Sequence, residues 1–233
     1  MTSGADALNA AQGGLQDVDC PICRNRGYIL LPGETLVCRE CECMAKRRTL
    51  KRMRRSGLCD LLDAYTFARY ETPEPWQRDA LSKARAFLDG GEGKWFFISG
   101  TPGTGKTHLC TAIAGQLIAA GREVRYMLWR EEAPRLKALV NDREAYEKLM
   151  GEFRRVPVLY IDDFFKGGVT EGDVNLAFEL LNGRYIRRNA ITLISSEKDA
   201  GTLLDIDEAI GSRIYERSRG FCIKTPAQNW RLR

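Results

Sequence analysis

A glycine-rich loop near the middle of the chain has the residue types and the spacing that bind phosphate. It reads GTPGTGKT and ends at Thr107. Gly100, Gly103 and Gly105 let the backbone curl so that successive amide hydrogens point at one anion, and the start of the next helix adds its positive dipole end. Lys106 can then reach the β- and γ-phosphates of a nucleoside triphosphate, and Thr107 can offer its hydroxyl to Mg²⁺. The predicted nucleotide-binding residues are Gly100, Thr101, Pro102, Gly103, Thr104, Gly105, Lys106, Thr107, His108 and Asp162.

Two adjacent carboxylates later in the chain complete this chemistry. Asp162 and Asp163 follow the apolar run 156–161, which is expected to be a buried strand. In phosphoryl chemistry the first carboxylate of such a pair holds Mg²⁺, usually through water, and the second can polarise the attacking water. At the end of another predicted strand, the hydroxyl of Ser195 or of Ser196 could orient water beside the γ-phosphate.

Five of the eight cysteines lie in one short segment near the N-terminus, at Cys20, Cys23, Cys38, Cys41 and Cys43. A Cys-x-x-Cys pair, followed after a hairpin-like stretch by a second pair, can set four thiolates tetrahedrally around Zn²⁺. A segment this short has too little apolar surface to fold without such a staple. Cys20 and Cys23 supply the first pair, and either Cys38 with Cys41 or Cys41 with Cys43 completes the site. Four thiolates leave no position for water, so the site is predicted to be structural.

Alternating strands and helices have to position these groups, which indicates an α/β fold with a parallel sheet flanked by helices. The expected strands are 95–98, 124–128, 156–161, 190–194 and 221–224. The expected helices are a basic one over 44–62 with a break at Gly57, then 76–88, the helix after the loop, 131–154, 173–188 and 205–217. The helix after the loop is expected to be amphipathic, with Leu109, Ile113 and Leu117 inward and Gly121 at its end. His108, the only histidine, lies on this helix, and we interpret it as a packing residue rather than a general base.

The composition allows one substantial core with a small module beside it, because the chain has 233 residues and is 44% hydrophobic. Residues 20–55 carry ten basic and three acidic side chains, a net +7, and the rest of the chain carries −2. A basic front end on a slightly acidic body suggests a nucleic acid or an acidic protein surface as partner. No apolar run approaches the roughly 20 residues of a membrane helix, and the N-terminus lacks a secretory pattern. We therefore expect a cytoplasmic protein with no membrane partner.

Seven segments together resemble the AAA+ ATPases of the DnaC and DnaI type, which load the bacterial replicative helicase. The segments are CPIC (20–23), CECM (41–44), GTPGTGKTHL (100–109), LYIDDFFKGG (159–168), ISSEK (194–198), LLDIDEAIGSRIYE (203–216) and NWRLR (229–233). The likeness covers most of the chain beyond the first 17 residues. Residues 1–17 are small and polar without periodicity, which predicts a mobile tail, and the stretch 63–75, with Pro73 and Pro75 at its end, predicts a linker. The expected domains are then a zinc-binding module with a basic helix at 18–62 and an AAA+ ATPase domain at 76–233.

Carried over position by position, the resemblance also implies roles for single residues. Thr107 and Asp162 would hold Mg²⁺, Asp163 would handle the attacking water, and Ser196 would be a first sensor. Arg213 would be an arginine finger that reaches the nucleotide of a neighbouring subunit. The implied catalytic residues are Lys106, Asp163, Ser196 and Arg213. The implied zinc ligands are Cys20, Cys23, Cys41 and Cys43, with Cys38 as a bystander.

The function that the resemblance implies is that of an ATP-dependent loader, which binds the hexameric replicative helicase and places it on single-stranded DNA during replication initiation. ATP binding and hydrolysis would switch assembly and release, with ATP, Mg²⁺ and Zn²⁺ as cofactors and self-association through the ATPase domain. The zinc module would grip the helicase. The main alternative is the related ATPase that assists transposases. A nucleoside or nucleotide kinase and an adaptor that scarcely hydrolyses ATP are further alternatives.

Two departures from the family pattern change these expectations. Asp163 stands where the family usually has glutamate, and its shorter reach predicts slow, switch-like hydrolysis. Only twenty residues follow Arg213, too few for the usual helical lid, so the lid is expected to be reduced or absent. This leaves Arg231 as the candidate for the second-sensor arginine, which normally lies in the lid.

Overall fold

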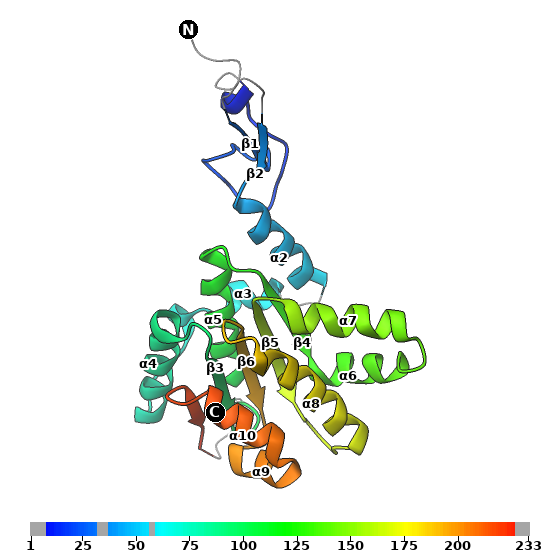
Figure 1. The fold of residues 1–233 in the computed structure, drawn as a ribbon. Coiled ribbons are helices and arrows are strands. Elements are labelled where there is room, and N and C mark those ends of the chain that lie inside the picture. The colour runs from blue at the N-terminus through cyan, green and yellow to red at the C-terminus, as the bar shows by residue number, and fades with distance from the viewer. Residues whose placement is uncertain (1–7, 32–36, 56–58, 227–233) are drawn as a thin grey trace.

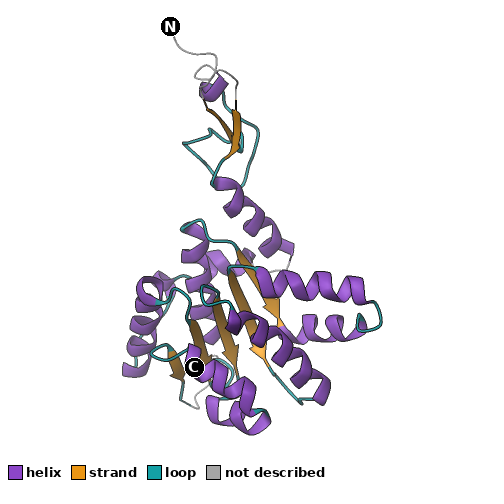
Figure 2. Ribbon diagram, viewed as in Figure 1, coloured by secondary structure: helices purple, strands orange, loops and turns teal. Residues whose placement is uncertain are grey.

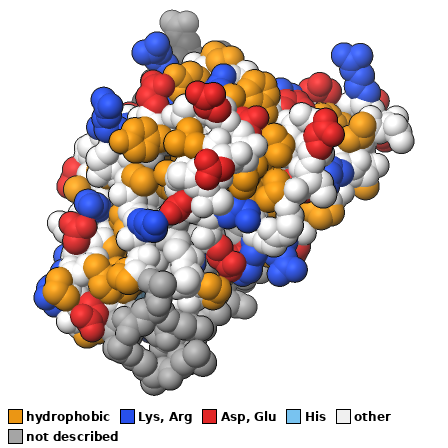
Figure 3. All heavy atoms as spheres, turned by 90° about the horizontal axis from the view of Figure 1, so that it is seen from below, with side chains coloured by type: hydrophobic (Ala, Val, Ile, Leu, Met, Phe, Trp, Pro, Cys, Tyr) orange, Lys and Arg blue, Asp and Glu red, His pale blue; other side chains and the backbone are white. Residues whose placement is uncertain are grey.

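A five-stranded parallel sheet forms the body of the computed structural model, which describes residues 8–31, 37–55 and 59–226 (Figure 1). The strand order is β4-β5-β6-β3-β7, and every neighbouring pair is parallel. The strands are β3 (Trp95–Ser99), β4 (Val124–Leu128), β5 (Val158–Phe164), β6 (Ile191–Ser196) and β7 (Cys222–Lys224). All strands therefore end at one edge of the sheet, which is where the phosphate-binding loop leaves β3. Figure 3 shows the molecule from this side, with acidic and basic side chains interspersed on the surface.

Helices cover both faces of this sheet (Figure 2). They are α4 (Pro75–Gly90), α5 (Lys106–Ala119), α6 (Trp129–Ala138), α7 (Arg143–Arg155), α8 (Glu171–Ile186), α9 (Ala200–Ile206) and α10 (Glu208–Arg217). Phe96 points to the face under α4 and α5, where it meets Phe87. Phe97, the next residue, points to the opposite core under α6 to α10 because side chains alternate along a strand. This layered α/β architecture confirms the predicted fold class.

A small N-terminal module stands apart from the body and is joined to it through α2 (Cys43–Arg55) (Figure 1). In it, β1 (Tyr28–Leu31) and β2 (Val37–Glu40) pair antiparallel. Asn9 exchanges two hydrogen bonds with the backbone of Leu30, and the Gly13 amide donates to the carbonyl of Arg24 at 2.7 Å. Residues 8–17 of the expected tail therefore pack on the module, and residues 1–7 lie outside the described part.

Two segments expected as single helices, 131–154 and 205–217, are each divided in two, and the basic segment forms two helices as well. The basic segment forms α2 and α3 (Cys59–Ala64), with the predicted break at Gly57 lying outside the described residues. The segment 131–154 is divided between α6 and α7, because Asp142 caps α7 by accepting from the Ala145 amide at 3.1 Å. Asp207 likewise caps α10 by accepting from the Ile210 amide at 2.7 Å and separates it from α9. Aspartate side chains at such positions accept hydrogen bonds from the free backbone amides at the start of a helix.

The helix after the loop is not amphipathic, contrary to the prediction. Leu109, Cys110, Ile113 and Ala114 of α5 are all fully buried, so the apolar surface extends around most of the helix. The reason is that α5 lies between the sheet and the helices α3 and α4, and contacts all of them. Gly121 follows α5 with a positive φ of 80°, the conformation in which glycine commonly ends a helix.

No helix follows α10 within residues 218–226, the last described part of the chain. In that described part, α10 is followed by β7. Arg231, the candidate second-sensor arginine, lies outside the described residues.

Candidate nucleotide site and metal centre

The phosphate-binding loop, residues 100–107, curls between the end of β3 and the start of α5. Gly100, Gly103 and Gly105 have positive φ angles of 142°, 79° and 81°, which side-chain-bearing residues rarely adopt. A Cβ atom added at Gly100 would lie 2.0 Å from the Thr225 hydroxyl oxygen. The glycines therefore let the loop close into a cradle, and a cradle of backbone amides at a helix start fits a phosphate group.

Lys106 places a cation inside this cradle. Its Nζ atom donates to the carbonyl oxygens of Gly100 at 2.8 Å and Thr101 at 2.7 Å. Burial lowers the pKa of the Lys106 amine below its usual value, although the carboxylates of Glu197, Asp163 and Asp162 act in the opposite direction. Among the described residues, the acceptors within hydrogen-bond distance of this amine are these two neutral carbonyl oxygens, so a phosphate oxygen would be a stronger partner.

Asp162 lies at the centre of a set of oxygen atoms at the end of β5. One of its carboxylate oxygens accepts from the Thr107 hydroxyl at 3.3 Å and from the Ser195 hydroxyl, and the other accepts from the Tyr126 hydroxyl at 3.1 Å. Burial raises the pKa of Tyr126, and the charge of Asp162 raises it further, so the phenol stays a donor. Carboxylate and hydroxyl oxygens are the ligands that Mg²⁺ prefers, and Thr107 with Asp162 fits the predicted magnesium site.

Asp163 projects into the cavity that the loop lines, which also has Thr107 and Lys106 in its wall. Its backbone φ of 54° lies in the left-handed region. Its carboxylate accepts from Lys166 Nζ at 2.9 Å, and Lys166 Nζ also lies 3.3 Å from Glu197. The second carboxylate of the pair therefore faces the space above the loop, in an ion-pair network that short motifs did not predict.

The structure distinguishes the two serines at the end of β6. The Ser195 hydroxyl contacts Asp162 and accepts from the Asp163 amide at 3.1 Å. The Ser196 hydroxyl instead donates to the Phe164 carbonyl at 2.7 Å and accepts from a backbone amide. Adjacent residues on a strand point to opposite faces, so only one hydroxyl can reach the acidic pair. Geometry thus favours Ser195 over Ser196 for the sensor position that the resemblance placed at Ser196.

His108 is held by the segment that connects the module to the body. Its Nε2 atom lies 2.8 Å from the Thr66 carbonyl oxygen, its ring stacks on Tyr65 at 4.8 Å, and Tyr70 meets it edge-on at 5.1 Å. Tyr65 and His108 both line the cavity over the loop. The histidine therefore has a packing partner on each side, and it joins the connecting segment to the edge of the nucleotide cavity.

Arg213 lies on the face of α10 that packs against α8, and it does not line the cavity of its own chain. Its guanidinium carbon lies 5.1 Å from the Phe178 ring centroid and 5.4 Å from that of Tyr185. Its Nη1 atom donates to the Ala209 carbonyl at 2.7 Å. The side chain is partly exposed, so its charge rests on an aromatic platform at the surface.

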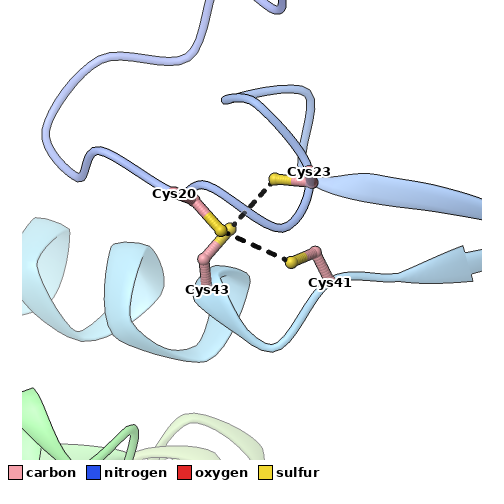
Figure 4. Close-up of side chains that lie close together, drawn as sticks. All are labelled: Cys20, Cys23, Cys41 and Cys43. Atoms are coloured by element: carbon pink, nitrogen blue, oxygen red, sulfur yellow. Dashed lines mark hydrogen bonds between the residues drawn. The ribbon is translucent and has the colours of Figure 1, made fainter. Parts of the chain in front are cut away.

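Four cysteines of the module converge on one point (Figure 4). The sulfur atoms of Cys20, Cys23, Cys41 and Cys43 lie within 4.8 Å of one another. The Cys20–Cys41 and Cys23–Cys43 sulfur distances are 3.8 and 3.6 Å. Tetrahedral Zn–S bonds of about 2.3 Å place sulfur atoms about 3.8 Å apart, so this set fits Zn²⁺. Cys38 lies exposed on β2, outside the cluster, which decides between the two sets that the spacing had left open.

Removing one cluster thiolate is expected to abolish most zinc binding. A Cys41→Ser chain should fall from about one zinc ion to nearly none, because a structural site needs all four ligands, and the module should lose stability with it. Metal analysis of the purified chain measures this directly. Cys38→Ser is the matched control and should keep its zinc; loss of zinc from that variant would contradict the ligand set.

The fold and the site together define a class of protein. A parallel α/β sheet whose loop after β3 cradles phosphate, with an acidic pair at the end of β5, is the core of a P-loop nucleotide-binding domain of the AAA+ type. Residues 31–222 match the family described as IstB-like ATP binding protein. The chain belongs to this IstB- and DnaC-like AAA+ family, and ATP is the nucleotide that its members bind.

Three similarities illustrate this membership. YqaM of Bacillus subtilis (strain 168), an uncharacterized protein, is 32% identical over 199 residues, which are 79% of this chain and 62% of YqaM. The chain thus spans less than two thirds of that relative. The replicative helicase loader DnaC of Escherichia coli (strain K12) is 30% identical over 189 residues, 78% of this chain and 72% of DnaC. A crystal structure of the DnaC helicase loader gives a TM-score of 0.59 at 23% identity and covers 67% of this chain and 94% of that one, a likeness of fold.

Within the part of the chain that the structure describes, none of the helices combines the length and the apolar character that crossing a membrane requires.

Proposed function

We propose that this protein is an ATP-dependent loader that binds the hexameric replicative helicase and places it on single-stranded DNA. The observation that carries this proposal is the pairing of a nearly complete nucleotide cavity with an arginine that lies outside it. Asp163 and Lys106 face one cavity, whereas Arg213 rests on the surface of α8. A site completed by a second copy turns ATP into a link between subunits, and such a link can switch an assembly on and off.

Hydrolysis at this site would use the residues in defined roles. The amides of the loop and the Lys106 amine hold the β- and γ-phosphates, and Asp163 orients a water molecule and accepts its proton. The water oxygen forms a bond to the γ-phosphorus as the bond to the bridging oxygen breaks, and the electron pair of that bond leaves with ADP. Thr107 and Asp162 would hold Mg²⁺, which neutralises charge on the phosphate oxygens when it is bound.

The zinc module is the part that would contact the helicase. It stands apart from the body on α2 (Figure 1), so a partner can reach it without covering the nucleotide cavity. The similarity to the replicative helicase loader DnaC of Escherichia coli extends over 78% of the chain and supports a hexameric helicase as the partner. The excess of basic residues between 20 and 55 supports an acidic partner surface or DNA.

Co-purification with replicative helicases tests this function. The chain is mixed with candidate hexameric helicases in ATP, in ADP and without nucleotide, and the complexes are separated by size-exclusion chromatography. ATP-dependent co-elution, and transfer of the helicase to single-stranded DNA, is the expected result. A chain that binds ATP but associates with none of the helicases would contradict the loader function.

A second candidate function is that of an ATPase that assists a transposase, because the matched family is described as IstB-like. The two functions differ in the DNA that the protein prefers. Tight, ATP-dependent coating of duplex DNA, seen by filter binding or electron microscopy, would favour the transposition role. The cysteine cluster of the module favours the loader.

A further inference from the structure

A strained turn follows the acidic pair and directs a lysine back into the nucleotide cavity. Asp163 and Phe165 have φ angles of 54° and 53°, a region that residues other than glycine rarely adopt, least of all aromatic ones. The Lys166 amide donates to the Asp163 carbonyl at 3.1 Å and closes the turn. The pairing of β5 with β6 shifts register at the same place, between Ile161 and Phe164. Strain of this kind persists only where packing compensates it, and it is common at functional sites.

Aromatic packing in the core holds this turn in place. The Phe165 ring is 1% exposed, stacks on Phe164 at 4.2 Å and meets Trp129 edge-on at 5.4 Å. With Phe165 buried, the next side chain has to leave the core. Lys166 consequently lines the same cavity as Lys106 and the phosphate-binding loop.

Lys166 is bound there by two carboxylates. Its Nζ atom lies 2.9 Å from Asp163 and 3.3 Å from Glu197, and all three side chains are between 25% and 31% exposed. Burial alone would lower the pKa of Lys166, but the hydrogen bonds and charges of Asp163 and Glu197 outweigh it and raise the pKa above its usual value. The amine is therefore cationic at neutral pH. Its ion pair engages the Asp163 carboxylate, which the attacking water would need as its hydrogen-bond acceptor.

A triphosphate in the cradle would compete for this amine. Its terminal phosphate adds negative charge and several acceptor oxygens, and an amine forms charge-assisted bonds with phosphate as it does with the carboxylates that hold it here. ADP lacks that phosphate. The amine of Lys106, by comparison, donates to the loop carbonyls of Gly100 and Thr101. Two cations therefore line the cavity, Lys106 in the phosphate-binding loop and Lys166 after β5.

We propose that Lys166 is a second cation for the terminal phosphate, which holds Asp163 and Glu197 when no triphosphate is bound and moves to a terminal phosphate oxygen when ATP is bound. This movement frees Asp163 to orient water only when ATP is present. The inference rests on the proposed ATPase function and deepens it. Lys166 both detects the γ-phosphate and keeps Asp163 from acting as the base until ATP is bound.

The ratio of ATP affinity to ADP affinity tests this role. In Lys166→Met, the dissociation constant for ATP should rise about tenfold, the effect of one charge-assisted bond, whereas that for ADP should stay nearly unchanged. Both constants are measured by displacement of a fluorescent nucleotide from the full chain. Lys166→Arg keeps the charge and should preserve most of the preference for ATP. Lys198→Met is the matched control, because Lys198 lies close in sequence but does not line the cavity, and it should change neither constant.

A second variant keeps the inference testable if Lys166→Met fails to fold. Glu197→Gln removes one competitor for the amine and should tighten ATP relative to ADP. An unchanged ATP-to-ADP ratio in either variant would overturn the role of Lys166. A wild-type chain that binds neither nucleotide would instead overturn the proposed ATPase function, so the two failures are distinguishable.

Discussion

Replacing Asp163 by asparagine is expected to lower ATP hydrolysis by at least about 100-fold while ATP binding persists. A positioned general base contributes roughly 10²- to 10⁴-fold to rate, and an amide cannot take the proton of the attacking water. Binding should persist because the phosphates are held by the loop and Lys106, on another wall of the cavity. Steady-state release of phosphate, together with a nucleotide-binding titration, separates the two effects.

The control for this variant is Asp205→Asn. Asp205 is an exposed residue of α9 that does not line the cavity, so its substitution should leave turnover at the wild-type rate. Full turnover in Asp163→Asn would show that another group orients the water. A variant that lost ATP binding as well would show instead that Asp163 is needed to form the site.

The sequence predicts the parts of this site that depend on short spacing. The loop needs glycines at fixed intervals next to Lys106, and the zinc ligands come in close pairs such as Cys20 with Cys23. Such local constraints can be recognised without the fold. An apolar run before Asp162 likewise predicts a strand that ends at the sheet edge, where the structure places the acidic pair beside the loop.

The remaining parts depend on contacts between distant segments and on backbone conformation. Tyr126 reaches Asp162 because β4 and β5 are neighbours, with Leu128 paired to Asp162, and the sequence does not give strand order. Lys166 turns back only because Asp163 and Phe165 adopt left-handed conformations, which no residue type there would suggest. The choice between Ser195 and Ser196 needs the register of β6. The division between α6 and α7 is hidden for another reason: Asp142 is a helix-capping residue type, but the apolar period of the segment 131–154 continues across it.

Replacing Arg213 by alanine is expected to lower ATP hydrolysis on the order of 1,000-fold, the lower end of what an arginine finger contributes. ATP binding by each chain should persist, because Arg213 does not line its own cavity. The aromatic platform of Phe178 and Tyr185 holds the guanidinium at the surface, where a neighbouring copy could meet it. Turnover measured at increasing protein concentration should rise more steeply than linearly for the wild type, since the site proposed here is completed only by a second chain.

Mixing variants distinguishes action in trans from action in cis. Arg213→Ala has a cavity but no finger, and Lys106→Ala has a finger but no working cavity, so each alone should be inactive and the mixture should recover part of the activity. Arg217→Ala is the matched control: Arg217 lies on the same helix, 5.8 Å from the same Tyr185 ring, and donates to the Arg188 carbonyl. If the mixture stays inactive while both variants remain folded and self-associate, Arg213 does not complete a neighbour's site. ATP would then be bound by each chain on its own, and assembly would have to be switched by some other contact.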